Sequence, residues 1–66
     1  MNWDQIEGKW KQMGGKVKQK WGRLTDDDIA VIDGNRGELE GRLQEAYGKT
    51  REEVKKEVEE FCRSCE

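Results

Sequence analysis

Histidine and proline are absent from this 66-residue sequence, and Ser64 is its only serine. Without histidine, the Ser-His and Cys-His pairs that activate a nucleophile cannot form. No apolar run approaches the length of about 18 residues that a membrane-spanning helix needs. The N-terminal residues also lack the apolar segment and cleavage site of a signal peptide. We therefore expect a cytoplasmic protein that does not insert stably into a membrane.

Only two cysteines occur, Cys62 and Cys65, three positions apart near the end of the sequence. Reactive C-x-x-C pairs lie at a helix N-terminus, whereas this pair lies at the C-terminal end of the last predicted helix, where the dipole opposes thiolate formation. A structural zinc site needs four ligands, and one chain with two cysteines and no histidine cannot supply a Cys/His set. We interpret both cysteines as small apolar residues on a terminal turn, with residues 61–66 a frayed tail. A redox pair or a disulfide-linked dimer is the alternative, and we expect neither a metal nor a cofactor.

Apolar residues are scarce, since 32% of the chain is hydrophobic and 42% is charged. The 13 basic and 15 acidic residues nearly cancel, to a net charge of −2, so the chain lacks the high net charge typical of disordered segments. A chain of this length buries only about 60% of its unfolded surface. We predict a single domain over residues 1–66, marginally stable and with a thin core.

The first third of the chain has apolar residues at alternating spacings of three and four, which is typical of one buried helix face. The glycine pair Gly14-Gly15 does not change this phase. We therefore predict one long helix over residues 3–22 and leave open whether it bends at the glycine pair. The apolar positions are Trp3, Ile6, Trp10, Met13, Val17, Trp21 and Leu24.

A second helix is predicted to begin after Thr25, which is a good N-cap residue, and to end at Asp33-Gly34. Asp26, Asp27 and Asp28 fill its first turn, where carboxylates interact favourably with the helix dipole. Calcium loops instead use alternate positions and a distal glutamate. We interpret the three aspartates as capping residues.

Two further helices follow. Asn35 can cap a helix that ends at Gly48, and Thr50 with Glu53 forms a capping box for the last helix. No segment shows the alternating pattern of a strand. The sequence thus predicts an all-α fold, a small domain of four helices.

Six glycines recur at a spacing of seven, in two sets. Glycine within a helix costs about 1 kcal/mol relative to alanine, so their positions require an explanation. Three are predicted helix stops. For Gly8, Gly15 and Gly41, the alternatives are helix ends and positions where another backbone approaches closely. The sets are Gly8, Gly15, Gly22 and Gly34, Gly41, Gly48.

Charge is distributed unevenly along the chain. Residues 1–23 contain six basic and two acidic side chains, whereas residues 24–66 contain seven basic and thirteen acidic ones. Such asymmetry can mark a face for an anionic partner; alternatively, the two halves neutralise one another or are simply solvated. Because the tryptophans are expected in the core, nucleic-acid binding would depend on the basic residues alone and would be salt-sensitive. These candidate residues are Lys9, Lys11, Lys16, Lys18, Lys20 and Arg23.

Several short motifs between residues 8 and 48 resemble a known pattern: Gly15-Lys16-Val17-Lys18, Trp21-Gly22, Leu24-Thr25-Asp26-Asp27-Asp28, Ile32-Asp33-Gly34, Leu43-Gln44 and Tyr47-Gly48. Through them the chain resembles the bacterial CsbD-like family of small stress-response proteins. This resemblance implies a small all-α fold of two helical hairpins packed crosswise, bacterial origin and expression linked to general stress. It implies no catalytic motif. Gly14 stands where such proteins usually have a bulkier residue, and residues 61–66 lie outside the pattern.

From these observations we expect a non-enzymatic stress-response protein that acts through abundance or through a binding partner. The alternative is a weak, sequence-independent nucleic-acid-binding module that uses the basic N-terminal helix. The partner is unknown at this point, and we expect a monomer or a weak homodimer.

Overall fold

The computed structural model describes residues 1–64. This part of the chain consists of helices joined by turns and loops, with no strand, so the all-α prediction is confirmed. Its five helices are α1 (Trp3–Gly8), α2 (Trp10–Lys20), α3 (Asp26–Ile32), α4 (Arg36–Tyr47) and α5 (Arg51–Ser64).

The predicted N-caps explain where three of the helices begin. Thr25 and Asp28 form a reciprocal capping box at the start of α3. Thr50 and Glu53 make the same pair of hydrogen bonds ahead of α5. The Asn35 side chain accepts a hydrogen bond from the first turn of α4. Each cap pairs a backbone N–H group that has no partner within the helix.

The prediction of four helices with a long first helix over residues 3–22 is wrong. The chain leaves helical geometry at Lys9 (φ −112°, ψ 28°), which separates α1 from α2, whereas Gly14-Gly15 lies inside the continuous helix α2. Two features favour the break. Gly8, a weak helix former, ends α1, and the Trp3 indole donates a 2.9 Å hydrogen bond to the Gly34 carbonyl, which holds α1 against the loop between α3 and α4.

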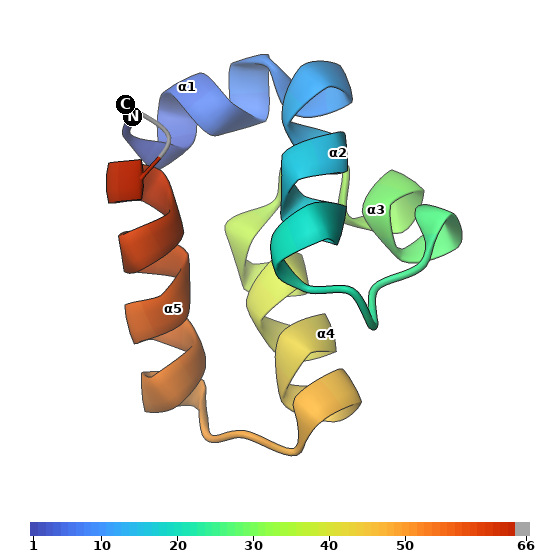
Figure 1. Cartoon of the computed structure of the whole chain (residues 1–66), viewed down its shortest axis with the longest axis vertical. Coiled ribbons are helices and arrows are strands. Elements are labelled where there is room, and N and C mark those ends of the chain that lie inside the picture. Colours follow the sequence, from blue (N-terminus) through green and yellow to red (C-terminus); the bar gives the residue numbers. More distant parts are fainter. Residues whose placement is uncertain (65–66) are drawn as a thin grey trace.

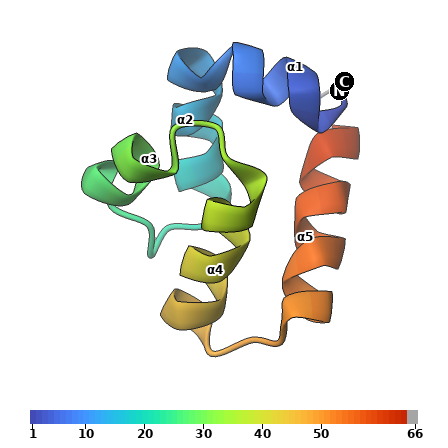
Figure 2. The same cartoon turned by 180° about the vertical axis from the view of Figure 1, so that it is seen from behind.

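The helices are arranged with α1 across the end of the molecule that contains the C-terminal turn of α5 (Figure 1). There the Met1 amine donates a hydrogen bond to the Cys62 carbonyl at 2.8 Å. α4 and α5 lie side by side in both views and form a hairpin (Figure 2). The first half of the chain supplies three short helices rather than the expected second hairpin of two.

The core is built from the predicted apolar stripe together with residues of α3, α4 and α5. Trp10 and Trp21 are buried, as predicted, and Trp3 is half-buried against the cluster. The Trp3 and Trp10 rings lie 6.1 Å apart, and Trp21 packs against Phe61 with ring centroids 5.3 Å apart. The buried apolar residues are Ile6, Trp10, Met13, Val17, Trp21, Leu24, Ile32, Leu39, Leu43, Val54, Val58 and Phe61.

Two glycines are required by close packing. A Cβ at Gly14 would lie 2.8 Å from Cγ2 of Ile29, so the absence of a side chain there lets α2 approach α3. Gly34 has φ +84°, and a Cβ there would lie 2.8 Å from Cγ of Glu7. Any other residue at position 34 would therefore meet both backbone strain and a steric clash.

The close approach considered for Gly8, Gly15 and Gly41 does not occur among residues 1–64. A Cβ at any of these three positions would have no atom within 4 Å. Gly8 ends a helix, but Gly15 and Gly41 lie inside α2 and α4, where alanine would fit. Packing within the chain therefore gives no reason for glycine at positions 15 and 41.

Candidate anion-binding face

All six predicted basic residues are exposed, and they gather around α2. Four of them lie on the helix itself, Lys9 lies at the break that precedes it, and Arg23 follows it in the loop to α3. No acidic residue occurs between Glu7 and Asp26. The exposed side of α2 therefore has no acidic residue of its own, although Asp26 and Asp33 line a hollow beside Lys11 and Lys18.

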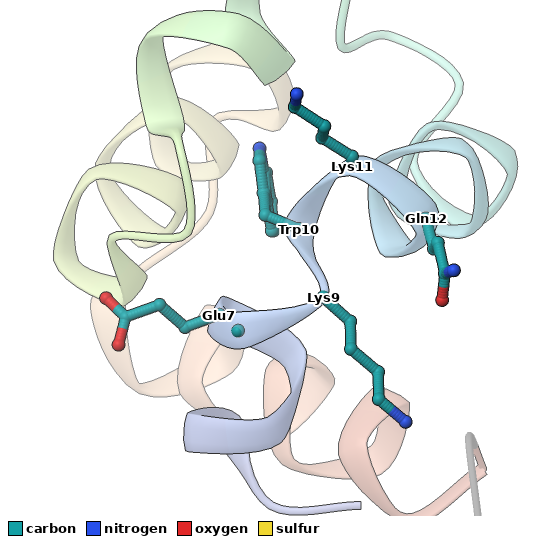
Figure 3. Close-up of a pocket in the computed structure, with 6 residues that line it drawn as sticks. Glu7, Lys9, Trp10, Lys11 and Gln12 are labelled. Carbon is teal, nitrogen blue, oxygen red and sulfur yellow. The ribbon is translucent and has the colours of Figure 1, made fainter.

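The lysines divide into two rows along α2. Because an α-helix has 3.6 residues per turn, Lys11 and Lys18 lie on one side of its exposed surface and Lys16 and Lys20 on the other. At the start of the helix, Figure 3 shows Lys9 and Lys11 pointing away from one another. The basic residues therefore do not form one continuous row.

Uncharged residues occupy the surface between the two rows. Gln12, Gly15 and Gln19 follow one another at spacings of three and four, which places them on the same side of α2. With Lys16 and Lys18 they line a shallow hollow of about 440 Å³. We call this surface the lysine-flanked face; its members are Lys11, Lys16, Lys18 and Lys20 around Gln12, Gly15 and Gln19.

Lys18 is the one lysine of this face with an ion-pair partner among residues 1–64. Its Nζ lies 2.7 Å from Oδ1 of Asp26 at the start of α3. The side chains are 46% and 86% exposed, and such a solvated pair is worth at most about 1 kcal/mol. The contact therefore neutralises Lys18 only weakly, and an external anion can compete for it.

Arg23, in contrast, is engaged by α4. Its Nη1 donates to the Ala46 carbonyl at 3.0 Å, and its guanidinium lies 5.5 Å from the centre of the Tyr47 ring. A cation at the carbonyl end of a helix is favourable because of the helix dipole. Arg23 thus links the loop after α2 to the end of α4, and we do not include it in the lysine-flanked face.

The remaining basic residues near α2 make no ion pair with the described part of the chain. Lys20 is exposed, and its Nζ lies over the Trp21 ring at 5.6 Å from the ring centre, a cation–π distance. Lys9, Lys11 and Lys16 are exposed, and no carboxylate of residues 1–64 lies within salt-bridge distance of them. Among these described residues, only Lys18 therefore has an ion pair with a carboxylate of the acidic half.

Carboxylates with shifted pKa values lie elsewhere and serve the fold. The backbone N–H of Thr25, followed by the Arg42 guanidinium, holds the pKa of Asp28 below its ordinary value. The same Asp28–Arg42 pair, at 2.7 Å, raises the pKa of Arg42 and ties α3 to α4. The capping role of Asp28 was predictable from its position, whereas its pairing with Arg42 was not. The backbone N–H of Thr50 likewise lowers the pKa of Glu53.

The cysteine motif is described only in part. Cys62 is half-buried in the last turns of α5, beside the core. Cys65 lies outside the described residues, so the distance between the two sulfur atoms is not defined. Within residues 1–64, no three acidic or cysteine side chains gather as metal ligands. None of the five helices has the length and apolar character needed to cross a membrane.

Sequence reasoning identified the lysines but missed Gln12 and Gln19. Their signal was present in the sequence, since they alternate with Gly8 and Gly15 at helical spacing on the side opposite the tryptophans.

Comparison with known proteins gives one match. The family model described as CsbD-like matches residues 4–56, which is most of the chain. No curated protein and no solved structure matches the chain.

Proposed function

The chain belongs to the CsbD-like family, and we propose that it is a small, cytoplasmic bacterial stress-response protein that acts by binding rather than by catalysis. Residues 1–66 form its single domain in this proposal. The lysine-flanked face of α2 is its contact surface for an anionic partner. The observation that carries the proposal is the exposure of four lysines on one helix, three of them without an ion pair to any of residues 1–64.

The use of the titratable groups supports a non-catalytic role. The shifted carboxylates, Asp28 and Glu53, are both N3 residues of capping boxes and are held by hydrogen bonds from threonine. A catalytic acid or base usually combines a shifted pKa with a place in a cleft. Here each shift has a structural cause at a helix start, which leaves the basic surface as the main feature available for function.

Sequence-independent nucleic-acid binding is the second candidate. The placement of the tryptophans favours contacts to phosphates over stacking on bases. Trp10 and Trp21 are buried and Trp3 is held by Gly34, so no tryptophan is presented for stacking on bases. Contacts would depend on lysine ammonium groups and phosphates. Binding of this kind is insensitive to sequence and weakens steeply with salt.

The test is a fluorescence-anisotropy titration of reduced protein into labelled single- and double-stranded DNA and RNA at 50 and 200 mM salt. We expect micromolar binding at the lower salt that is lost at the higher. The double variant Lys16→Gln/Lys20→Gln should bind less tightly, whereas Lys55→Gln/Lys56→Gln, an equal charge change on exposed positions of α5, should not. Absence of binding at 50 mM to all four probes would eliminate the nucleic-acid candidate and direct the search to protein partners.

A further inference from the structure

The geometry of α2 points to double-stranded DNA as the partner: we propose that the lysine-flanked face enters the major groove. In this arrangement Gly15 and the two glutamines face the base edges, and the lysines of the two rows reach the phosphates of the two strands. The inference rests on the nucleic-acid-binding candidate above and specifies its ligand.

The width of the exposed helix surface suits this groove. An α-helix with its side chains is about 10–12 Å across, and the B-DNA major groove is about 12 Å wide. Entry therefore favours a helix whose leading surface is narrow. Gly15 lies on that surface, has no side chain, and faces open space beyond its Cα. The 11 residues of α2 span about 16 Å, enough to contact several base pairs.

The two lysine rows match the two phosphate strands that border the groove. Lys11 and Lys18 lie on the side of α2 that faces α3, where Lys18 meets Asp26. On the opposite side, Lys16 and Lys20 lie beside the last turns of α5, with which they share a hollow. A helix that bound one phosphate strand would need only one of these rows. Two rows separated by an uncharged strip fit a ligand that has negative charge on both sides.

The rest of the fold leaves this face available and disfavours other orientations. α2 lies in front of α4 in Figure 1 and behind it in Figure 2. All seven residues of the lysine-flanked face are exposed, so no described part of the chain covers it. Residues 24–66 have thirteen acidic against seven basic side chains. Phosphates repel that excess of negative charge, so α2 is the helix that faces the DNA.

Duplex DNA fits better than RNA or single strands. The major groove of A-form RNA is deep and too narrow for side chains to read. Single-stranded nucleic acid is usually bound by stacking bases on aromatic rings, and the seven residues of the lysine-flanked face include no aromatic ring. Gln12 and Gln19 add hydrogen-bonding groups that can reach base edges or phosphates.

The test compares a 20-base-pair DNA duplex with an RNA duplex and a single-stranded DNA of equal length, by anisotropy at several salt concentrations. Four lysine–phosphate contacts predict a log–log salt slope of about −3.6, or affinity about 150-fold lower at 200 mM than at 50 mM. Lys11→Gln/Lys18→Gln and Lys16→Gln/Lys20→Gln should each reduce that slope by about 1.8. The control Lys55→Gln/Lys56→Gln should leave it unchanged, and circular dichroism checks that every variant is folded.

The outcomes distinguish entry into the major groove from nucleic-acid binding in general. Tighter binding to duplex DNA, with both rows required and with competition by the major-groove ligand methyl green but not by the minor-groove ligand netropsin, supports groove entry. Equal or tighter binding to RNA or single strands, or dependence on one row only, overturns groove entry but leaves nucleic-acid binding in place. Binding to none of the three probes at 50 mM overturns both groove entry and nucleic-acid binding. Binding only to vesicles of an anionic lipid has the same consequence.

Discussion

Replacing Trp10 with phenylalanine is expected to destabilise the protein more than the same replacement of Trp21, although both rings are buried. The reason is the indole N–H group. Nε1 of Trp10 donates a 2.9 Å hydrogen bond to the Ile29 carbonyl. Nε1 of Trp21 is buried and has no hydrogen-bond partner in the part of the chain that the structure describes.

The magnitude of the difference follows from these two environments. Trp10→Phe removes a hydrogen bond whose net contribution is about 0.5–1.5 kcal/mol. Trp21→Phe instead removes a desolvated donor whose burial costs about 1–3 kcal/mol. The loss of ring volume is chemically the same at both sites and largely cancels in the comparison. The free energies of unfolding of the two variants should therefore differ by about 1.5–4.5 kcal/mol, with Trp10→Phe the less stable.

Urea denaturation and thermal melting followed by circular dichroism measure this difference. At about 4–8 °C per kcal/mol for a domain of this size, the two melting temperatures should lie at least about 6 °C apart. Trp3→Phe is a useful third variant, because its indole is bonded to Gly34 but only half-buried, and it should fall between the other two. Equal destabilisation at positions 10 and 21, or greater destabilisation at 21, would refute the reasoning.

Three further predictions concern packing, acid stability and binding. Gly15→Ala should raise the free energy of unfolding by about 0.5–1 kcal/mol in a urea titration, whereas Gly14→Ala should lower it because its Cβ meets α3. Asp28 and Glu53 have pKa values below their ordinary 3.8 and 4.5, so the stability that they contribute is present above about pH 4.5 and is lost as the pH falls through their folded-state pKa values; melts between pH 7 and 2 should show this loss, and less of it in Asp28→Asn. Asp26→Asn releases Lys18 and removes a negative charge beside it, so it should tighten DNA binding at 50 mM salt by up to about five-fold, the range that an exposed ion pair allows; weaker binding by this variant would contradict the reasoning.

The capping boxes and the buried stripe could be predicted because both depend on residues close together in the chain. Thr25 with Asp28, and Thr50 with Glu53, are local patterns, and the structure contains both. The break at Lys9 could not be found in this way. Apolar spacing reports which face is buried, and that phase continues through Lys9 while the helix direction changes.

Local sequence likewise cannot show which of the two adjacent glycines of α2 is required by packing. Gly14 and Gly15 have nearly identical local sequence, and both lie within a helix. Only the position of α3, set by contacts distant in sequence, makes one of them a packing requirement and leaves the other open. Likewise, the sequence predicts exposed lysines but not which of them has a carboxylate partner. The Lys18–Asp26 pair depends on how the loop after α2 turns back.

The side of α2 that packs in the core is separate from the side proposed to bind the ligand. Binding can therefore be tested by substitutions that leave the core intact. Its apolar side contributes Trp10, Met13 and Val17 to the core. The lysine-flanked face contributes no buried contact, so substitutions there should change binding while changing the free energy of unfolding by no more than about 0.5 kcal/mol. Gly15 is the informative exception, because alanine should stabilise the helix there. If Gly15→Ala raises stability and weakens duplex binding, the glycine at this position is explained by close approach of the ligand rather than by folding.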